Sequence, residues 1–267
     1  MVPSSTKMND GLMVWVDCYC WFYKDLSAPK QAKFIRLLNA FIQDTNFIGV
    51  GITITDEMRV AVGGWAVFLV LNMPLDITWY QRIEQISIFP GDCLKHQGQS
   101  LGQMNSGSHY CQIELAWDEV RNSSTKAFVS SNTVLHEFAH SLDYIDRVID
   151  GSPSVLLKAG EREVWEKAFS TGYIFEKRTH KRNQLWHFFG LGRWNEFDPD
   201  NPGCVDVGEL FAVSTELFFE SPRSLLRQAP EIYQCLVMLY KCNPIDDFPK
   251  RNWIQRKLNM LIELLKR

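Results

Sequence analysis

The chain has 267 residues, 46% hydrophobic and 22% charged, so it can bury a sizeable core in one large domain or two small ones. A formal net charge of −3 and a pI of about 6.1 carry no basic excess, so we expect no direct binding to nucleic acid or to an anionic membrane. The seven cysteines form no CxxC pair, which argues against a zinc ribbon and favours reduced thiols in a cytoplasmic protein.

Two apolar stretches in the first part of the chain could be a signal peptide or a membrane span. In GLMVWVDCYCWFY, at 11–23, Asp17 interrupts the apolar run and no small-residue cleavage site follows, so a signal peptide is not expected. The run VAVGGWAVFLVLNM, at 60–73, is shorter than the ~20 residues of a membrane span and is expected to be a buried helix. We expect an N-terminal segment at 1–25, one domain at 26–267, and no membrane segment.

The first half of the chain alternates between helical and extended patterns. Apolar spacing of three and four residues predicts helices, and alternation of β-branched residues predicts strands. The expected elements are a helix from Ser27, a strand at 47–54, a helix at 57–71 capped by Thr55 or Asp56 and ended by Pro74, a strand at 82–90, loops or hairpin tips at 91–109, and a strand at 110–117.

Helices dominate the second half. The expected elements are a connection at 118–132, a helix from 133 capped by Ser130, Ser131 or Asn132, a helix at 159–172, an irregular loop at 190–206, a helix from Asp206 to Ser221, and helices at 223–240 and 248–266. This order predicts an α+β fold, a mostly helical single domain with a small mixed β-sheet beside the helix from 133.

That helix carries the motif TVLHEFAHSLD. His136 and His140 lie four residues apart, on one helix face, where two imidazoles can bind one zinc ion at about 2.0–2.1 Å. Glu137 is one step round the helix, where its carboxylate can take a proton from a metal-held water. Two unliganded histidines on a helix shoulder are the alternative, but the apolar flanks indicate burial, and buried imidazoles need partners. The motif therefore predicts one zinc ion per chain and a catalytic role for Glu137.

A catalytic zinc requires a third protein ligand, and spacing leaves three candidates. Glu209 lies in the first turn of the later helix, and Glu216 follows two turns on along the same face. Either would give the gluzincin arrangement, a HExxH motif with a distant helical glutamate. Asp143 lies on the motif helix itself, and we expect it rather to accept the free N–H of a ligand histidine.

HEFAHSLD together with GELFAVSTELFFESP resembles the Mlc titration factor A family of zinc-dependent peptidases, which are related to the catalytic domain of anthrax lethal factor. LSAPKQAKFIRLLNAFIQD, ISIFP, GQS and IELAWDEV are further family-like stretches in the same order, and the resemblance covers roughly 26–245. It implies His136, His140 and Glu209 as zinc ligands, Glu137 as general base and a supporting role for Glu216.

The resemblance also implies aminopeptidase-like action on peptides or small aminoacyl substrates, and a partner, because the name-giving member sequesters a transcriptional repressor of glucose uptake. One position departs from the family. Pro202 stands where the family has a tyrosine that steadies the oxyanion, so another donor is needed or the rate is low. This departure keeps open a catalytically weak zinc-containing binding protein. A secreted toxin-like protease is the weaker alternative.

We also expect the strand at 110–117 to be the edge strand beside the zinc, pairing with substrate by strand addition, and the loop at 190–206 to be able to cover the site.

Overall fold

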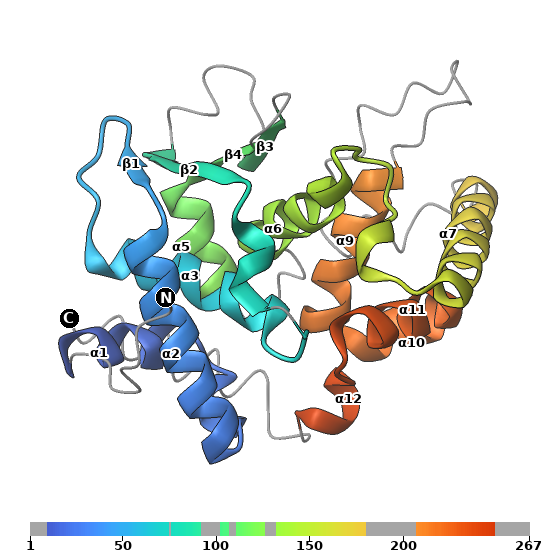
Figure 1. Cartoon of the computed structure of the whole chain (residues 1–267), viewed down its shortest axis with the longest axis horizontal. Coiled ribbons are helices and arrows are strands. Elements are labelled where there is room, and N and C mark those ends of the chain that lie inside the picture. Colours follow the sequence, from blue (N-terminus) through green and yellow to red (C-terminus); the bar gives the residue numbers. More distant parts are fainter. Residues whose placement is uncertain are drawn as a thin grey trace.

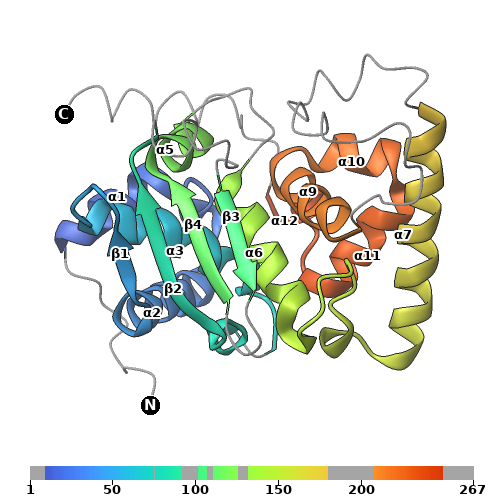
Figure 2. The ribbon, with the colours of Figure 1, turned by 90° about the horizontal axis from the view of Figure 1, so that it is seen from above.

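The structure is a computed structural model, which describes residues 10–74, 76–91, 102–106, 111–125, 132–179 and 207–248. A small sheet lies over helices from the first half of the chain, and the helices of the second half lie on the other side of α6 (Figures 1 and 2). The α+β class and the mostly helical single body with a mixed sheet are confirmed. α6 lies between the two halves and contacts elements of both.

The sheet has four strands in the order β1-β2-β4-β3. The strands are β1 (Phe47–Gly49), β2 (Ile83–Phe89), β3 (Gly102–Ser106) and β4 (Cys111–Ala116). β1, β2 and β4 run parallel, while β3 runs antiparallel to β4. β3 therefore forms the edge next to α6, as Figure 2 shows.

Three helices build the core of the first half. They are α1 (Asp10–Tyr19), α2 (Ala28–Asp44) and α3 (Asp56–Val70), and both α1 and α2 pack on α3. The side chain of Thr55 accepts a hydrogen bond from the Met58 N–H and caps α3. α3 is buried nearly all round, as its unbroken apolar run predicts. The apolar stretch at 11–23 belongs to the same core, because Tyr19 and Phe22 are fully buried.

The remaining α-helices of the described residues all come after β4 in the chain. They are α5 (Trp117–Thr125), α6 (Thr133–Asp143), α7 (Ala159–Thr179), α9 (Val207–Glu220), α10 (Pro222–Gln228), α11 (Pro230–Tyr240) and α12 (Pro244–Asp247). Short 3-10 helices lie at η1 (Tyr23–Asp25), η2 (Asp76–Tyr80), η3 (Tyr144–Asp146) and η4 (Ser154–Leu156).

Several sequence expectations in the sheet region are wrong. The strand expected at 47–54 ends at Gly49, because the chain turns at Gly51, whose φ is 74°. The loops expected at 91–109 include the edge strand β3, and the connection expected at 118–132 begins with α5. The strand expected at the edge, β4, lies inside the sheet between β2 and β3.

One helix expected in the C-terminal part is divided. The single helix expected at 223–240 is α10 followed by α11, because Pro230 offers no N–H to continue the first helix and disfavours a helical conformation at Ala229. The helix expected at 248–266 lies outside the described residues, apart from Phe248. Among the described residues, no helix is long and apolar enough to cross a membrane.

Trp65 on α3 gives a test of this core. Its indole contacts the rings of Trp21, Phe22 and Phe68 and is fully buried. We expect Trp65→Ala to lower the free energy of unfolding by about 3–5 kcal/mol, measured by urea denaturation. Val164→Ala removes carbon atoms at a side chain that is 55% exposed, and should stay within about 0.5 kcal/mol of wild type. Equal effects of the two changes would contradict this description of the core.

Candidate metal centre

α6 is buried on every side: all of its 11 residues lie in the interior. Apolar residues such as Leu135 and Phe138 pack against the neighbouring helices, and Phe138 contacts Phe41 and Tyr80. Of the three caps considered from the sequence, the structure uses Asn132, whose side chain accepts from the Leu135 N–H at 3.2 Å. Polar side chains on this helix therefore have to find partners within the protein.

The partners come from α9, which packs against α6. Glu209 lies in the first turn of α9, where the unpaired N–H groups of a helix favour negative charge. Its side chain is 44% exposed, whereas those of His136 and His140 are only 7% and 8% exposed. The site is therefore closed on the α6 side and open toward solvent at Glu209.

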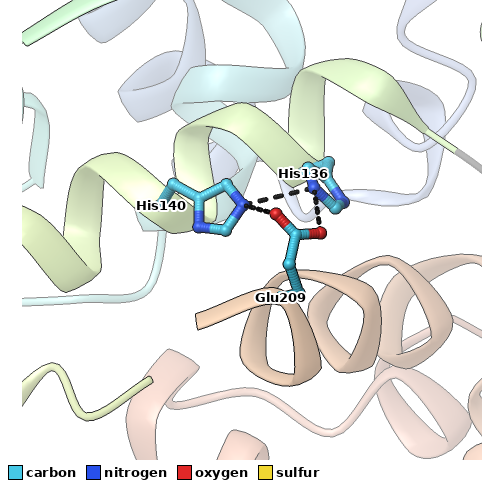
Figure 3. Close-up of side chains that lie close together, drawn as sticks. All are labelled: His136, His140 and Glu209. Atoms are coloured by element: carbon cyan, nitrogen blue, oxygen red, sulfur yellow. Dashed lines mark hydrogen bonds and ion pairs between the residues drawn. The ribbon is translucent and has the colours of Figure 1, made fainter. Parts of the chain in front are cut away.

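His136, His140 and Glu209 converge on one point, as Figure 3 shows. The Nε2 atoms of the histidines are 3.2 Å apart, His140 Nε2 is 3.0 Å from Glu209 Oε1, and His136 Nε2 is 3.2 Å from Glu209 Oε2. Ligand atoms around a tetrahedral zinc with bonds of 2.0–2.1 Å lie about 3.3 Å from one another. The three donors therefore have the spacing and chemistry to hold a metal ion.

Glu216 lies behind the cluster rather than in it. Its Oε1 is 2.7 Å from Nδ1 of His136, the nitrogen that faces away from Glu209. A carboxylate can only accept, so Nδ1 carries the hydrogen, and Nε2 is the nitrogen that can bind a metal ion once it has lost its proton. The other oxygen of Glu216 accepts from the backbone N–H of Asn132 at 2.5 Å. One carboxylate thus orients a histidine and anchors the start of α6.

Sequence reasoning did not single out Glu220, which completes this anchor. Its Oε1 accepts from the side-chain amide of Asn132 at 3.2 Å. The sequence could have indicated Glu220 by its position one turn after Glu216, because this spacing puts both carboxylates on the same face of α9.

The electrostatics of the cluster follow from its acidic surroundings. Burial lowers the pKa of His136, but the bonds to Glu209 and Glu216 outweigh it and raise that pKa well above its usual value. Burial raises the pKa of Glu209, and the two histidines outweigh it and lower that pKa. The acidic surroundings thus favour a positive charge at His136. In a metal-loaded site, the metal cation would provide that positive charge instead.

Glu137 and Asp143 occupy different surroundings on α6. Glu137 is 2% exposed, and its charge also favours the protonated form of His136. Asp143 was expected to accept from a ligand histidine, but its Oδ2 accepts from the Gly151 N–H at 2.8 Å, and Oδ1 has no hydrogen-bond partner in the described part of the chain. Glu216, not Asp143, makes the histidine contact.

Three further sequence expectations lie outside the described residues. They concern Pro202 at the family tyrosine position, the loop at 190–206, and the Asp206 cap of the helix that begins, as described, at Val207.

Comparison with known proteins gives one matching family and two similar proteins. Residues 4–241 match the family described as glucose-regulated metallo-peptidase M90. An uncharacterized protein of Synechocystis is 26% identical over 236 residues, which cover 84% of this chain and 81% of that protein. Mlc titration factor A of Pectobacterium atrosepticum is 24% identical over 234 residues, which cover 82% of each protein.

Asp143 provides a test of the burial beside this cluster. Burial raises its pKa to about 7, the Gly151 N–H acts in the opposite direction, and the charges of Asp150 and Asp146 raise it further. Since the unfolded carboxyl ionises near 3.9, the penalty for its charge in the fold is absent below about pH 4, grows between pH 4 and 7, and is complete above that.

In metal-free protein, Asp143→Asn should therefore gain stability relative to wild type as pH rises through that window, by roughly 4 kcal/mol. Urea unfolding at a series of pH values measures the difference. The control is Asp44→Asn, which removes an exposed carboxylate. A difference for Asp143→Asn that stays constant with pH would show that this carboxyl ionises normally.

Proposed function

Since the chain belongs to the M90 family of glucose-regulated metallo-peptidases, we propose that it is a zinc-dependent peptidase of aminopeptidase-like action on peptides or small aminoacyl compounds. The observation that carries the proposal is the convergence of His136, His140 and Glu209 at the spacing of three zinc ligands with one open side. We assign one zinc ion per chain to these three side chains.

The chemistry divides between the ion and the protein. A bound zinc supplies an acidified water and polarises the substrate carbonyl. Glu137 accepts the proton of the attacking water and delivers it to the leaving amine. Glu216 holds His136 in the tautomer that presents Nε2. A metal bound only for structure would not require a carboxylate at Glu137, which favours catalysis over a structural role.

Substrate is proposed to lie along β3 rather than β4. Among the described residues β3 is the edge strand of the sheet, and it packs against α6. An extended peptide paired with the side of β3 that faces no described strand would pass close to the helix of the histidines.

We place the protein in the cytoplasm. Cys18, Cys20, Cys111, Cys235 and Cys242 are buried free thiols, as is usual in a reducing compartment.

The likeness to Mlc titration factor A supports a second candidate function: binding and sequestering a transcriptional repressor of sugar uptake, with or without peptidase activity. A change confined to Glu137 separates the two functions, because this buried side chain can be neutralised without altering the surface of the protein.

Glu137→Gln tests the catalytic assignment. Removing the base should lower kcat/KM by about 10²–10⁴ on a panel of chromogenic aminoacyl substrates, while zinc content stays near one ion per chain. Glu231→Gln, which neutralises an exposed glutamate, is the control and should keep full activity. If wild type binds zinc and cleaves nothing, the sequestering function takes precedence. If wild type holds no zinc, the ligand assignment is wrong.

Glu216→Gln tests the support of His136. A neutral amide no longer favours the Nδ1–H tautomer as strongly, so zinc affinity should fall about 10- to 100-fold in a chelator competition. Glu166→Gln, at an exposed site on α7, should leave affinity unchanged. Circular dichroism of the metal-free protein shows whether the variant is folded. If the Glu216→Gln protein is folded and binds zinc with wild-type affinity, Glu216 does not support the metal ligand His136.

A further inference from the structure

Gly151 lies in the turn between α6 and α7 and contacts three parts of the site's scaffold. Its N–H donates to Asp143 at the end of α6, and its carbonyl accepts from the indole N–H of Trp165 on α7 at 2.8 Å. It also packs against Val207, the first residue of α9. Gly151 thus contacts the end of the helix of the two histidines and the first residue of the helix of Glu209.

No other residue fits at this position. The φ angle of Gly151 is 72°, which disfavours any side chain. A Cβ atom built there would lie 2.6 Å from the carbonyl carbon of Val207 and 2.7 Å from its Cγ1, and still closer to its carbonyl oxygen. Atoms cannot remain at such distances, so the backbone of α9 or of the turn would have to move.

The consequence of such a movement follows from the position of Glu209. Val207 lies two residues before Glu209, in the same first turn of α9. On the other side of Glu209, Phe211 packs edge-on against Trp165 at 5.6 Å between ring centroids. Gly151 therefore contacts the turn of Glu209 in two ways. It packs directly against Val207, and its carbonyl bonds Trp165, whose ring packs against Phe211.

We propose that Gly151 is a positioning residue for the metal centre: the close approach of its backbone to Val207 sets the placement of Glu209 relative to His136 and His140. This rests on the proposed function, because it assigns Glu209 as the third ligand. A small displacement of Glu209 would disturb the cluster, since the separations between its three donors all lie between 3.0 and 3.2 Å.

Gly151→Ala tests the proposal, and Gly51→Ala is its matched control. Gly51 has nearly the same φ, 74°, but a Cβ there would meet only Pro90 at an ordinary 3.9 Å, far along the chain from the site. Both changes place a Cβ atom on a residue with positive φ, so both strain the backbone to a similar extent. Only the Cβ atom at position 151 would clash with α9. The readouts are zinc affinity by chelator competition, the visible spectrum of the cobalt-substituted protein, which reports ligand geometry, and urea unfolding of the metal-free proteins.

We expect Gly151→Ala to bind zinc about tenfold or more weakly and to change the cobalt spectrum, while Gly51→Ala matches wild type in both. Wild-type affinity and spectrum in folded Gly151→Ala would overturn the proposal. An equal loss of affinity in Gly51→Ala would also overturn it, by tracing the effect to general strain.

Trp165→Phe keeps the proposal testable if Gly151→Ala does not fold. It removes the indole N–H from the Gly151 carbonyl and retains a ring beside Phe169 and Phe211. We expect about two- to tenfold weaker zinc binding and a smaller spectral change in the same direction. An unchanged cobalt spectrum here would overturn the proposal. If the wild-type protein itself binds neither zinc nor cobalt, both the proposed function and the role of Gly151 are wrong. This result differs from those above, in which wild type binds metal and only the variants are compared.

Discussion

The contact between α6 and α9 is the constraint on which the centre depends. Both helices are largely apolar, so packing alone would hold them together at many small offsets. The carboxylate of Glu216 removes this freedom, because it bonds the Asn132 N–H and the His136 imidazole at once. A buried polar group that loses its partner destabilises the fold, and this network therefore favours one register of the helix pair.

The same network explains why so many acidic groups can lie together inside the protein. Glu137, Glu216 and Glu220 are each at most 9% exposed, and ionised carboxylates are costly to bury without compensation. Amide donors from Asn132 satisfy two of them, and the imidazole of His136 adds a further donor. The remaining excess of negative charge faces the donors of the candidate metal cluster, so the scaffold is arranged to favour a cation there.

Local patterns predicted the parts of the structure that depend on neighbouring residues. The helix of the histidines, its cap and the buried α3 follow from spacing, capping chemistry and composition within short windows. The order of the strands does not, since β3 reaches the edge only through pairing with β4 across the sheet. Glu209 and Glu216 share one face of α9 at helical spacing, and only the placement of that helix against α6 puts one at Nε2 and the other at Nδ1 of His136. The crowding at Gly151 is likewise invisible in sequence, because Val207 lies far away along the chain.

The donors of the centre come from two helices with α7 and a long stretch of chain between them. An ion held by both would act as a reversible cross-link, present in the folded chain and absent from the unfolded one. By mass action, metal at a thousand times its dissociation constant adds about 4.1 kcal/mol to the folded state. Whole domains are stable by only about 5–15 kcal/mol. The abundance of this protein in a cell would therefore follow the supply of metal, with the loaded chain outlasting the empty one in the presence of proteases.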